Sequence, residues 1–229
     1  MAENLEAFRS RTSFITRTLP EGGGFSTNAK LALKVDEAGR LLPFFGDTVI
    51  FDLPEEDKAW LGDLQRGLYE RCGDLLAEPL NPASFHITLH DLDSCAPAED
   101  MVHLAPRNRK LSLGLLGELP EDWAVNVRST LVFNMVNTSL VLGFEPVSDA
   151  DCLALTDLYD RFQLVVKHYE FMTPHVTLAY YRPIQGGDDV LSRLRGAVEE
   201  VNGELSPRVI RLCHPRYATF TDMNRYQWG

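Results

Sequence analysis

Two short segments of the chain share a pattern of side chains that can move protons. Two of the six histidines begin matching tetrads, His86-Ile87-Thr88-Leu89 and His175-Val176-Thr177-Leu178. In a β-strand, residues i and i+2 project from the same face, so each histidine shares a face with a threonine about 7 Å away. An imidazole has an ordinary pKa near ~6.5 and can give or take a proton, and a hydroxyl can donate a hydrogen bond to an anionic oxygen. Each tetrad therefore indicates half of an acid–base site.

The two tetrads occupy equivalent places in a duplicated stretch of chain. Pro54 and Pro146 are 92 residues apart, the segments Leu68–Arg71 and Leu158–Arg161 are 90 apart, and the tetrads are 89 apart. Three landmarks with a nearly constant offset indicate one internal duplication. A pseudo-twofold axis between the copies then brings both tetrads to one shared cleft.

Two imidazoles facing one cleft can supply the acid and the base for the hydrolysis of a phosphate ester. One can take a proton from an attacking water while the other gives one to a leaving oxygen. Two hydroxyls beside them can donate to a nonbridging phosphate oxygen as charge builds in the transition state. We therefore expect His86 and His175 to be catalytic and Thr88 and Thr177 to bind phosphate.

Hydrophobic periodicity and turn residues predict the elements that position these residues. The first copy is expected to contain, in order, a strand over Thr48–Leu53, a helix from Pro54 or Glu55, a strand over Ser84–Leu92, a helix within Ala98–Leu116 and a strand pair over Ala124–Val136. The second is expected to contain a strand over Ser139–Phe144, a helix opened by Ser148, a strand over Thr173–Arg182, a helix over Asp188–Asn202 and strands within Arg208–Met223. A hairpin of Lys30–Val35 and Leu41–Phe44, ended by Gly46, is expected before them.

These elements predict an α+β protein with a duplicated, two-lobed, pseudo-twofold symmetric fold. Two antiparallel sheets are expected around a central cleft, with helices on the outer faces. The single domain spans residues 1–229, with an N-terminal extension and hairpin over 1–44, lobe one over about 45–136 and lobe two over about 137–223.

The paired His86-x-Thr88 and His175-x-Thr177 motifs, in strands of a duplicated chain, resemble the two-histidine (2H) phosphoesterase superfamily over roughly residues 45–223. That superfamily includes 2′,5′-RNA ligase-like proteins and cyclic nucleotide phosphodiesterases. The Gly46-Asp47-Thr48 start and the Phe220–Asn224 ending resemble a bacterial and fungal branch of it. The resemblance implies metal-independent hydrolysis or transfer at 2′,3′-cyclic phosphates or 2′,5′ linkages, with both histidines as acid and base and no cofactor. The implied partner is a small nucleotide or a short RNA end with a cyclic phosphate.

Four residues near the ends of predicted strands are candidates for contacts with the rest of the substrate. An aromatic face can stack on a base and an arginine can bind a phosphate. The candidates are Tyr181, Arg182, Arg216 and Tyr217.

Two other functions remain open at this point. The first is a noncatalytic module of the same fold that binds nucleotides or RNA ends. The second is a metal-dependent hydrolase, because His90 follows His86 at i+4 on the expected cleft face. The equivalent position in the second copy is Ala179, and no third ligand with clear spacing follows, so we expect no metal site.

Composition limits the partners further. With 22 basic and 33 acidic residues, the net charge of −11 opposes binding to long nucleic acids, which are held by Lys and Arg. No run approaches the ~18–20 apolar residues of a membrane span, and the first ten residues lack the apolar stretch of a signal peptide. We therefore expect a cytoplasmic monomer without a membrane partner.

Overall fold

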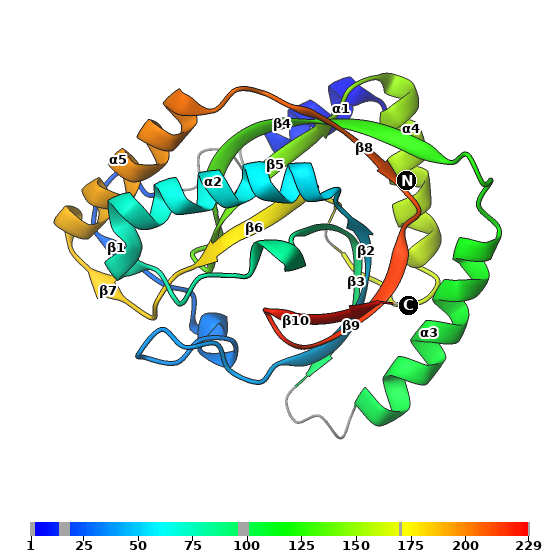
Figure 1. The fold of residues 1–229 in the computed structure, drawn as a ribbon, viewed down its shortest axis with the longest axis horizontal. Coiled ribbons are helices and arrows are strands. Elements are labelled where there is room, and N and C mark those ends of the chain that lie inside the picture. The colour runs from blue at the N-terminus through cyan, green and yellow to red at the C-terminus, as the bar shows by residue number, and fades with distance from the viewer. Residues whose placement is uncertain (1–2, 14–18, 96–100, 170, 229) are drawn as a thin grey trace.

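The computed structural model describes residues 3–13, 19–95, 101–169 and 171–228. Two four-stranded antiparallel sheets lie at its centre (Figure 1). The first has the strand order β10-β9-β2-β3, from Arg225–Trp228, Arg216–Asp222, Phe45–Asp52 and His86–Cys95. The second has the order β6-β5-β4-β8, from His175–Tyr180, Ser139–Pro146, Ala124–Met135 and Val209–Cys213. The two-sheet α+β architecture expected from the sequence is confirmed.

The strands of the two copies are exchanged between the sheets. In the first copy, β2 and β3 pair with each other, but β4 crosses to the second sheet and pairs with β5. In the second copy, β5 and β6 pair, but β9 crosses back to pair with β2. The expected boundary between lobes at residue 136 falls in the turn between β4 and β5, which pair with each other. Because this turn, at residues 136–138, is tight, the two strands form a hairpin across that boundary.

The helices lie around the two sheets (Figure 1). They are α1 (Leu5–Thr12), α2 (Glu55–Cys72), α3 (Met101–Gly117), α4 (Asp149–Phe162) and α5 (Asp188–Glu204). Helix α2 begins directly after Pro54, and the Ser148 hydroxyl caps α4 by accepting from the Asp151 amide. Both starts agree with the sequence. None of the described helices is long and apolar enough to cross a membrane.

Two details of the strands differ from the sequence analysis. The expected strand pair over Ala124–Val136 is one long strand, β4, which reaches both β5 and β8. A strand beyond Met223, β10, was not expected, and it pairs with β9 through a turn at residues 223–224.

The expected N-terminal hairpin is reduced to a single bridge between Val35 and Leu41. Its first half is a 3-10 helix, η2 (Ala29–Leu33), because the Asn28 side chain accepts from the Lys30 amide and turns the chain. Upstream, the short strand β1 (Phe25–Ser26) pairs with β7 (Gln185–Gly186).

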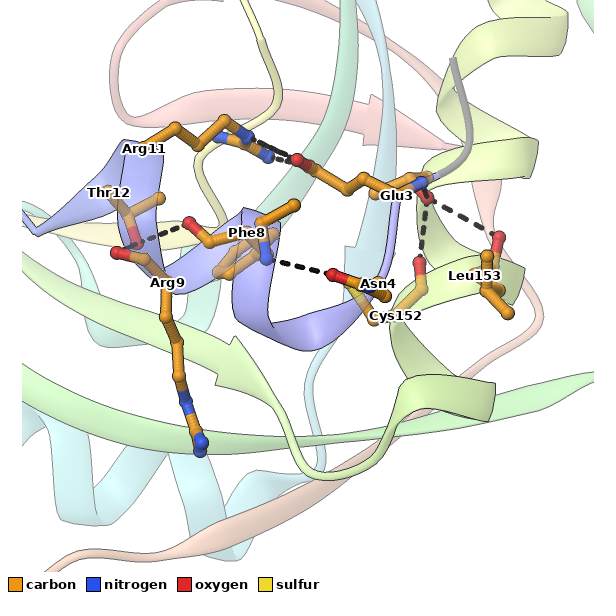
Figure 2. A network of polar contacts seen from close by, with 10 residues as sticks. Glu3, Asn4, Phe8, Arg9, Arg11, Thr12, Cys152 and Leu153 are labelled. Carbon is orange, nitrogen blue, oxygen red and sulfur yellow. Dashed lines mark hydrogen bonds and ion pairs between the residues drawn. The ribbon is translucent and has the colours of Figure 1, made fainter.

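Helix α1 is attached to the second sheet and to α4. Figure 2 shows Glu3 and Arg11 joined side by side, with Cys152 and Leu153 of α4 nearby. The Arg11 guanidinium donates to both Glu3 carboxylate oxygens, and the Glu3 amide donates to the Thr156 hydroxyl at 3.2 Å. The N-terminal segment is thus part of the folded structure.

Gly46 lies inside β2, not at the end of a hairpin, and its environment explains why a glycine stands there. A Cβ at this position would lie 2.2 Å from the Phe220 ring and 2.7 Å from the Asp93 carbonyl oxygen. We expect Gly46→Ala to lower the free energy of unfolding by about 1–3 kcal/mol, because the added methyl group overpacks two neighbouring strands. Chemical denaturation followed by circular dichroism measures this change.

Gly196→Ala is the matched control, because Gly196 lies inside α5 and a Cβ there meets no atom within 4 Å. This substitution should stabilise the protein by about 0.5–1 kcal/mol, the usual gain of alanine over glycine in a helix. Equal effects of the two substitutions would contradict the packing described for β2.

Candidate functional site

The two histidine-bearing strands meet at the edges of their sheets. Strands β3 and β6 are each the last strand of a sheet, and they lie against each other. Over residues 85–89 and 174–178, buried residues alternate with half-buried ones, and His86, Thr88, His175 and Thr177 all occupy half-buried positions. The alternation arises because the intervening apolar residues pack beneath the helices.

All four residues of the two motifs line one cavity of about 530 Å³. The pseudo-twofold relation inferred from the sequence thus brings the two tetrads together. The volume falls within the range typical of small-molecule sites.

Each of the two histidines is held by the same hydrogen bond. The Nδ1 atom of His86 lies 2.7 Å from the carbonyl oxygen of Ser84, and Nδ1 of His175 lies 2.7 Å from that of Thr173. A carbonyl oxygen can only accept, so Nδ1 carries the hydrogen in both rings. Nε2 is then the atom of each ring that can take up or release a proton. A neutral ring can act as a base through Nε2, and a protonated ring as an acid.

The protein environment favours the neutral form of both rings. Removal from water lowers the pKa of His86, while its bond to the Ser84 carbonyl and the charge of Asp91 oppose that change. Desolvation also lowers the pKa of His175, and the Lys34 charge lowers it further, against the bond to the Thr173 carbonyl and the charge of Asp91. The two rings also differ in their charged neighbours, because Asp52 raises the pKa of His86 only.

His90 lines the same cavity as His86, but it does not continue the alternation of His86 and Thr88. A β-bulge in β3 places Val49 opposite His90 and Ile50 opposite Thr88, so the alternation shifts by one residue after Thr88. As a result, the Asp91 side chain is exposed, whereas His90 is only 1% exposed.

His90 is instead part of a packed cluster. Its ring centroid lies 4.8 Å from that of Tyr159 and 4.9 Å from that of His168. Burial lowers the pKa of His90 to about 4, so this ring is neutral at pH 7. Among the residues that the structure describes, no three His, Cys, Asp or Glu side chains are grouped so as to hold a metal ion.

The four candidates for substrate contact are not brought to the cavity. Tyr181 is fully buried against Phe25 of β1, and its hydroxyl donates to Asn134. Arg182 donates to the backbone carbonyls of Asp74 and Glu37 at the surface.

The other pair lies on β9. Arg216 is exposed outside the cavity, and the Tyr217 hydroxyl donates to Asp47 and to the Ala105 carbonyl under α3. The packing of β1 and α3 decides where the two tyrosines lie, and no local sequence pattern signals that packing.

Several residues of the cavity were missed by the sequence analysis. Tyr226 of β10 packs its ring 4.5 Å from that of His86, and Asp91 and Lys34 also line the cavity. The duplication gives no signal for Tyr226 or Lys34, because both lie outside the two copies. Asp91 lies within the expected strand Ser84–Leu92, where regular alternation points it away from the His86 face, and the bulge brings it to the cleft.

No protein-family model matches the sequence, and no curated protein matches it. Solved structures do match. The crystal structure of ATU0111, a conserved protein of unknown function from Agrobacterium tumefaciens C58, superposes with a TM-score of 0.70 at 18% identity, covering 90% of this chain and 93% of that one.

Two further structures match at lower TM-scores. E. coli LigT gives 0.41 at 13% identity, covering 82% of this chain and 94% of LigT, and it has also been crystallised with ATP and with 3′-AMP. A protein described as a phosphoesterase gives 0.43 at 12% identity, covering 82% and 94%. The chain has the two-lobed α+β fold of the Agrobacterium protein, and its structural neighbours include LigT and a phosphoesterase.

Proposed function

We propose that this protein is a two-histidine phosphoesterase that opens a 2′,3′-cyclic phosphate, or cleaves a 2′,5′ linkage, on a small nucleotide or short RNA end. One observation carries the proposal: two His-x-Thr pairs, with the same Nδ1-to-carbonyl bond in each, line one cavity. A purely structural role would not require two matched imidazoles whose Nε2 atoms can exchange a proton.

The charges around the rings favour different roles for the two histidines. Lys34 disfavours a proton on His175, whereas Asp52 favours one on His86. In the proposed reaction, His175 Nε2 takes a proton from a water molecule as the water oxygen bonds to phosphorus.

The bond from phosphorus to the leaving ribose oxygen then breaks, and His86 Nε2 gives that oxygen its proton. The product is a ring-opened phosphate monoester. Proton exchange with solvent returns both rings to their starting forms. Thr88 and Thr177 donate to the nonbridging oxygens, whose negative charge is greatest in the transition state.

The same cavity also fits a noncatalytic module that binds nucleotides. Such a module needs the threonines and the cavity walls but no proton transfer at Nε2. A measurement of turnover therefore distinguishes the phosphoesterase from the noncatalytic module, whereas a measurement of binding does not.

The proposed chemistry needs no metal ion, because the chain supplies acid, base and hydrogen-bond donors. We expect hydrolysis of at least one nucleoside 2′,3′-cyclic phosphate or 2′,5′-linked dinucleotide at an unchanged rate in excess EDTA. Chromatography of the products measures this. Activity lost in EDTA and restored by zinc or manganese would instead support a metal-dependent hydrolase.

Removal of either imidazole should abolish most of the turnover without unfolding the protein. We expect His86→Ala and His175→Ala each to lower kcat by about 10²–10⁴, the usual contribution of one acid or base. The double variant should lose much less than the product of the two effects, because the pair acts as a unit. Thr88→Ala and Thr177→Ala should have smaller effects. A folded His86→Ala or His175→Ala variant with near-normal kcat would favour the noncatalytic module.

The lowered pKa values of both histidines predict an acidic pH optimum. Activity requires one protonated and one neutral ring, so kcat/KM against pH should be bell-shaped, with its maximum below about 6.5. The two limbs belong to the coupled pair. Asp91→Asn removes a charge that favours both protonated rings, so it should move both limbs to lower pH.

Asp189→Asn, at an exposed position in the first turn of α5, is the control and should leave the profile unchanged. A maximum above pH 7, or an Asp91→Asn profile identical to that of the wild type, would contradict the proposed electrostatics.

A further inference from the structure

The N-terminal segment supplies a positive charge to the cavity. Lys34 follows η2 and lines the cavity together with His86 and His175. Its ammonium group lies 4.9 Å from the ring centroid of Phe44 and 5.6 Å from that of Tyr180. The ammonium is thus held over two aromatic faces, an arrangement that stabilises a cation.

The backbone of Lys34 is fixed on both sides. Its amide donates to the Leu31 carbonyl at 2.8 Å, and its carbonyl accepts from the Leu42 amide at 2.8 Å. The adjacent Val35 and the preceding Leu31 are buried in the core. The segment therefore fixes the backbone of this lysine beside the cavity.

Lys34 forms no ion pair with any carboxylate in the part of the chain that the structure describes. Among the described residues, every ion pair involves other side chains, and none places a carboxylate within 4.0 Å of the Lys34 ammonium. This is notable in a chain with a net charge of −11. A half-buried cation without a carboxylate partner is suited to an anionic ligand.

The reacting phosphate does not need this cation. A cyclic phosphate diester carries one negative charge, and the proposed site already gives it two hydroxyl donors and a protonated imidazole.

We propose that Lys34 binds a second phosphate of the substrate, so that the preferred substrates carry a phosphate on the 5′ oxygen of the nucleotide whose cyclic phosphate is opened. This inference rests on the proposed function and names its substrate class. The second phosphate can be a terminal 5′-monophosphate or the diester that joins the last nucleotide to a short RNA. Both sources present the same anionic oxygens to the ammonium.

The test compares three substrates that share one base: adenosine 2′,3′-cyclic phosphate, its 5′-phosphorylated form, and the dinucleotide ApA ending in a 2′,3′-cyclic phosphate. We expect kcat/KM of the wild type to be about 10- to 100-fold higher for at least one phosphate-bearing substrate, the range of one charged hydrogen bond. A preference for the 5′-monophosphate alone identifies a mononucleotide substrate, and a preference that includes the dinucleotide identifies an RNA end.

Lys34→Gln should bring the ratio of kcat/KM between the phosphate-bearing substrates and adenosine 2′,3′-cyclic phosphate to about one, and Lys34→Arg should retain most of the preference. Because Lys34 also acts on His175, the readout is this ratio and not the rate on any single substrate. Lys30→Gln is the matched control, because Lys30 is an exposed lysine in η2, the 3-10 helix that directly precedes Lys34. It should leave all three substrates unaffected. Equal losses on all three substrates in Lys34→Gln, or no wild-type preference, would overturn the inference.

A binding measurement separates this inference from the proposed reaction. Calorimetry with adenosine 3′-phosphate and adenosine 3′,5′-bisphosphate needs no turnover. We expect the wild type to bind the bisphosphate about 10- to 100-fold more tightly, and Lys34→Gln to bind both about equally. Tighter bisphosphate binding without any turnover supports the second phosphate site and refutes the phosphoesterase, whereas turnover with equal binding of the two ligands does the reverse.

Discussion

The exchange of β4 and β9 between the two sheets is the constraint on which the rest of the structure depends. Each sheet contains strands from both copies, so neither sheet can form without the other half of the chain. The exchange leaves β3 and β6 at the edges of their sheets, where they meet. The cavity lies where those two edges meet, and residues of both β3 and β6 line it.

The parts of the fold and the site that follow a local pattern could be predicted from the sequence. The alternation around His86 and His175 and the helix start at Ser148 depend on neighbouring residues only. The strand exchange could not be predicted, because a duplication shows which segments are equivalent but not which sheet a third strand joins. The positions of Tyr181 and Tyr217 were missed for the same reason: β1 and α3 come from distant parts of the chain and bury them.

The bulge in β3 shows how one inserted residue changes the composition of a site. A regular strand would present His90 to the cleft beside His86 and Thr88. The bulge buries the His90 ring against Tyr159 at the wall of the cavity and adds the exposed Asp91 carboxylate to the lining beside it. No turn residue or glycine marks the bulge in the sequence, and hydrophobic periodicity alone does not predict its position.

The N-terminal segment makes the two halves of the cavity unequal. A cleft lined only by the two equivalent His-x-Thr pairs would present the same surface after rotation by half a turn, and a ligand could enter it in two opposite poses. Lys34 lies on one side only, and its counterpart is absent because the segment that carries it was not duplicated. The cavity is therefore chemically different at its two ends, so a bound anion with two unlike ends would be favoured in one of the two orientations.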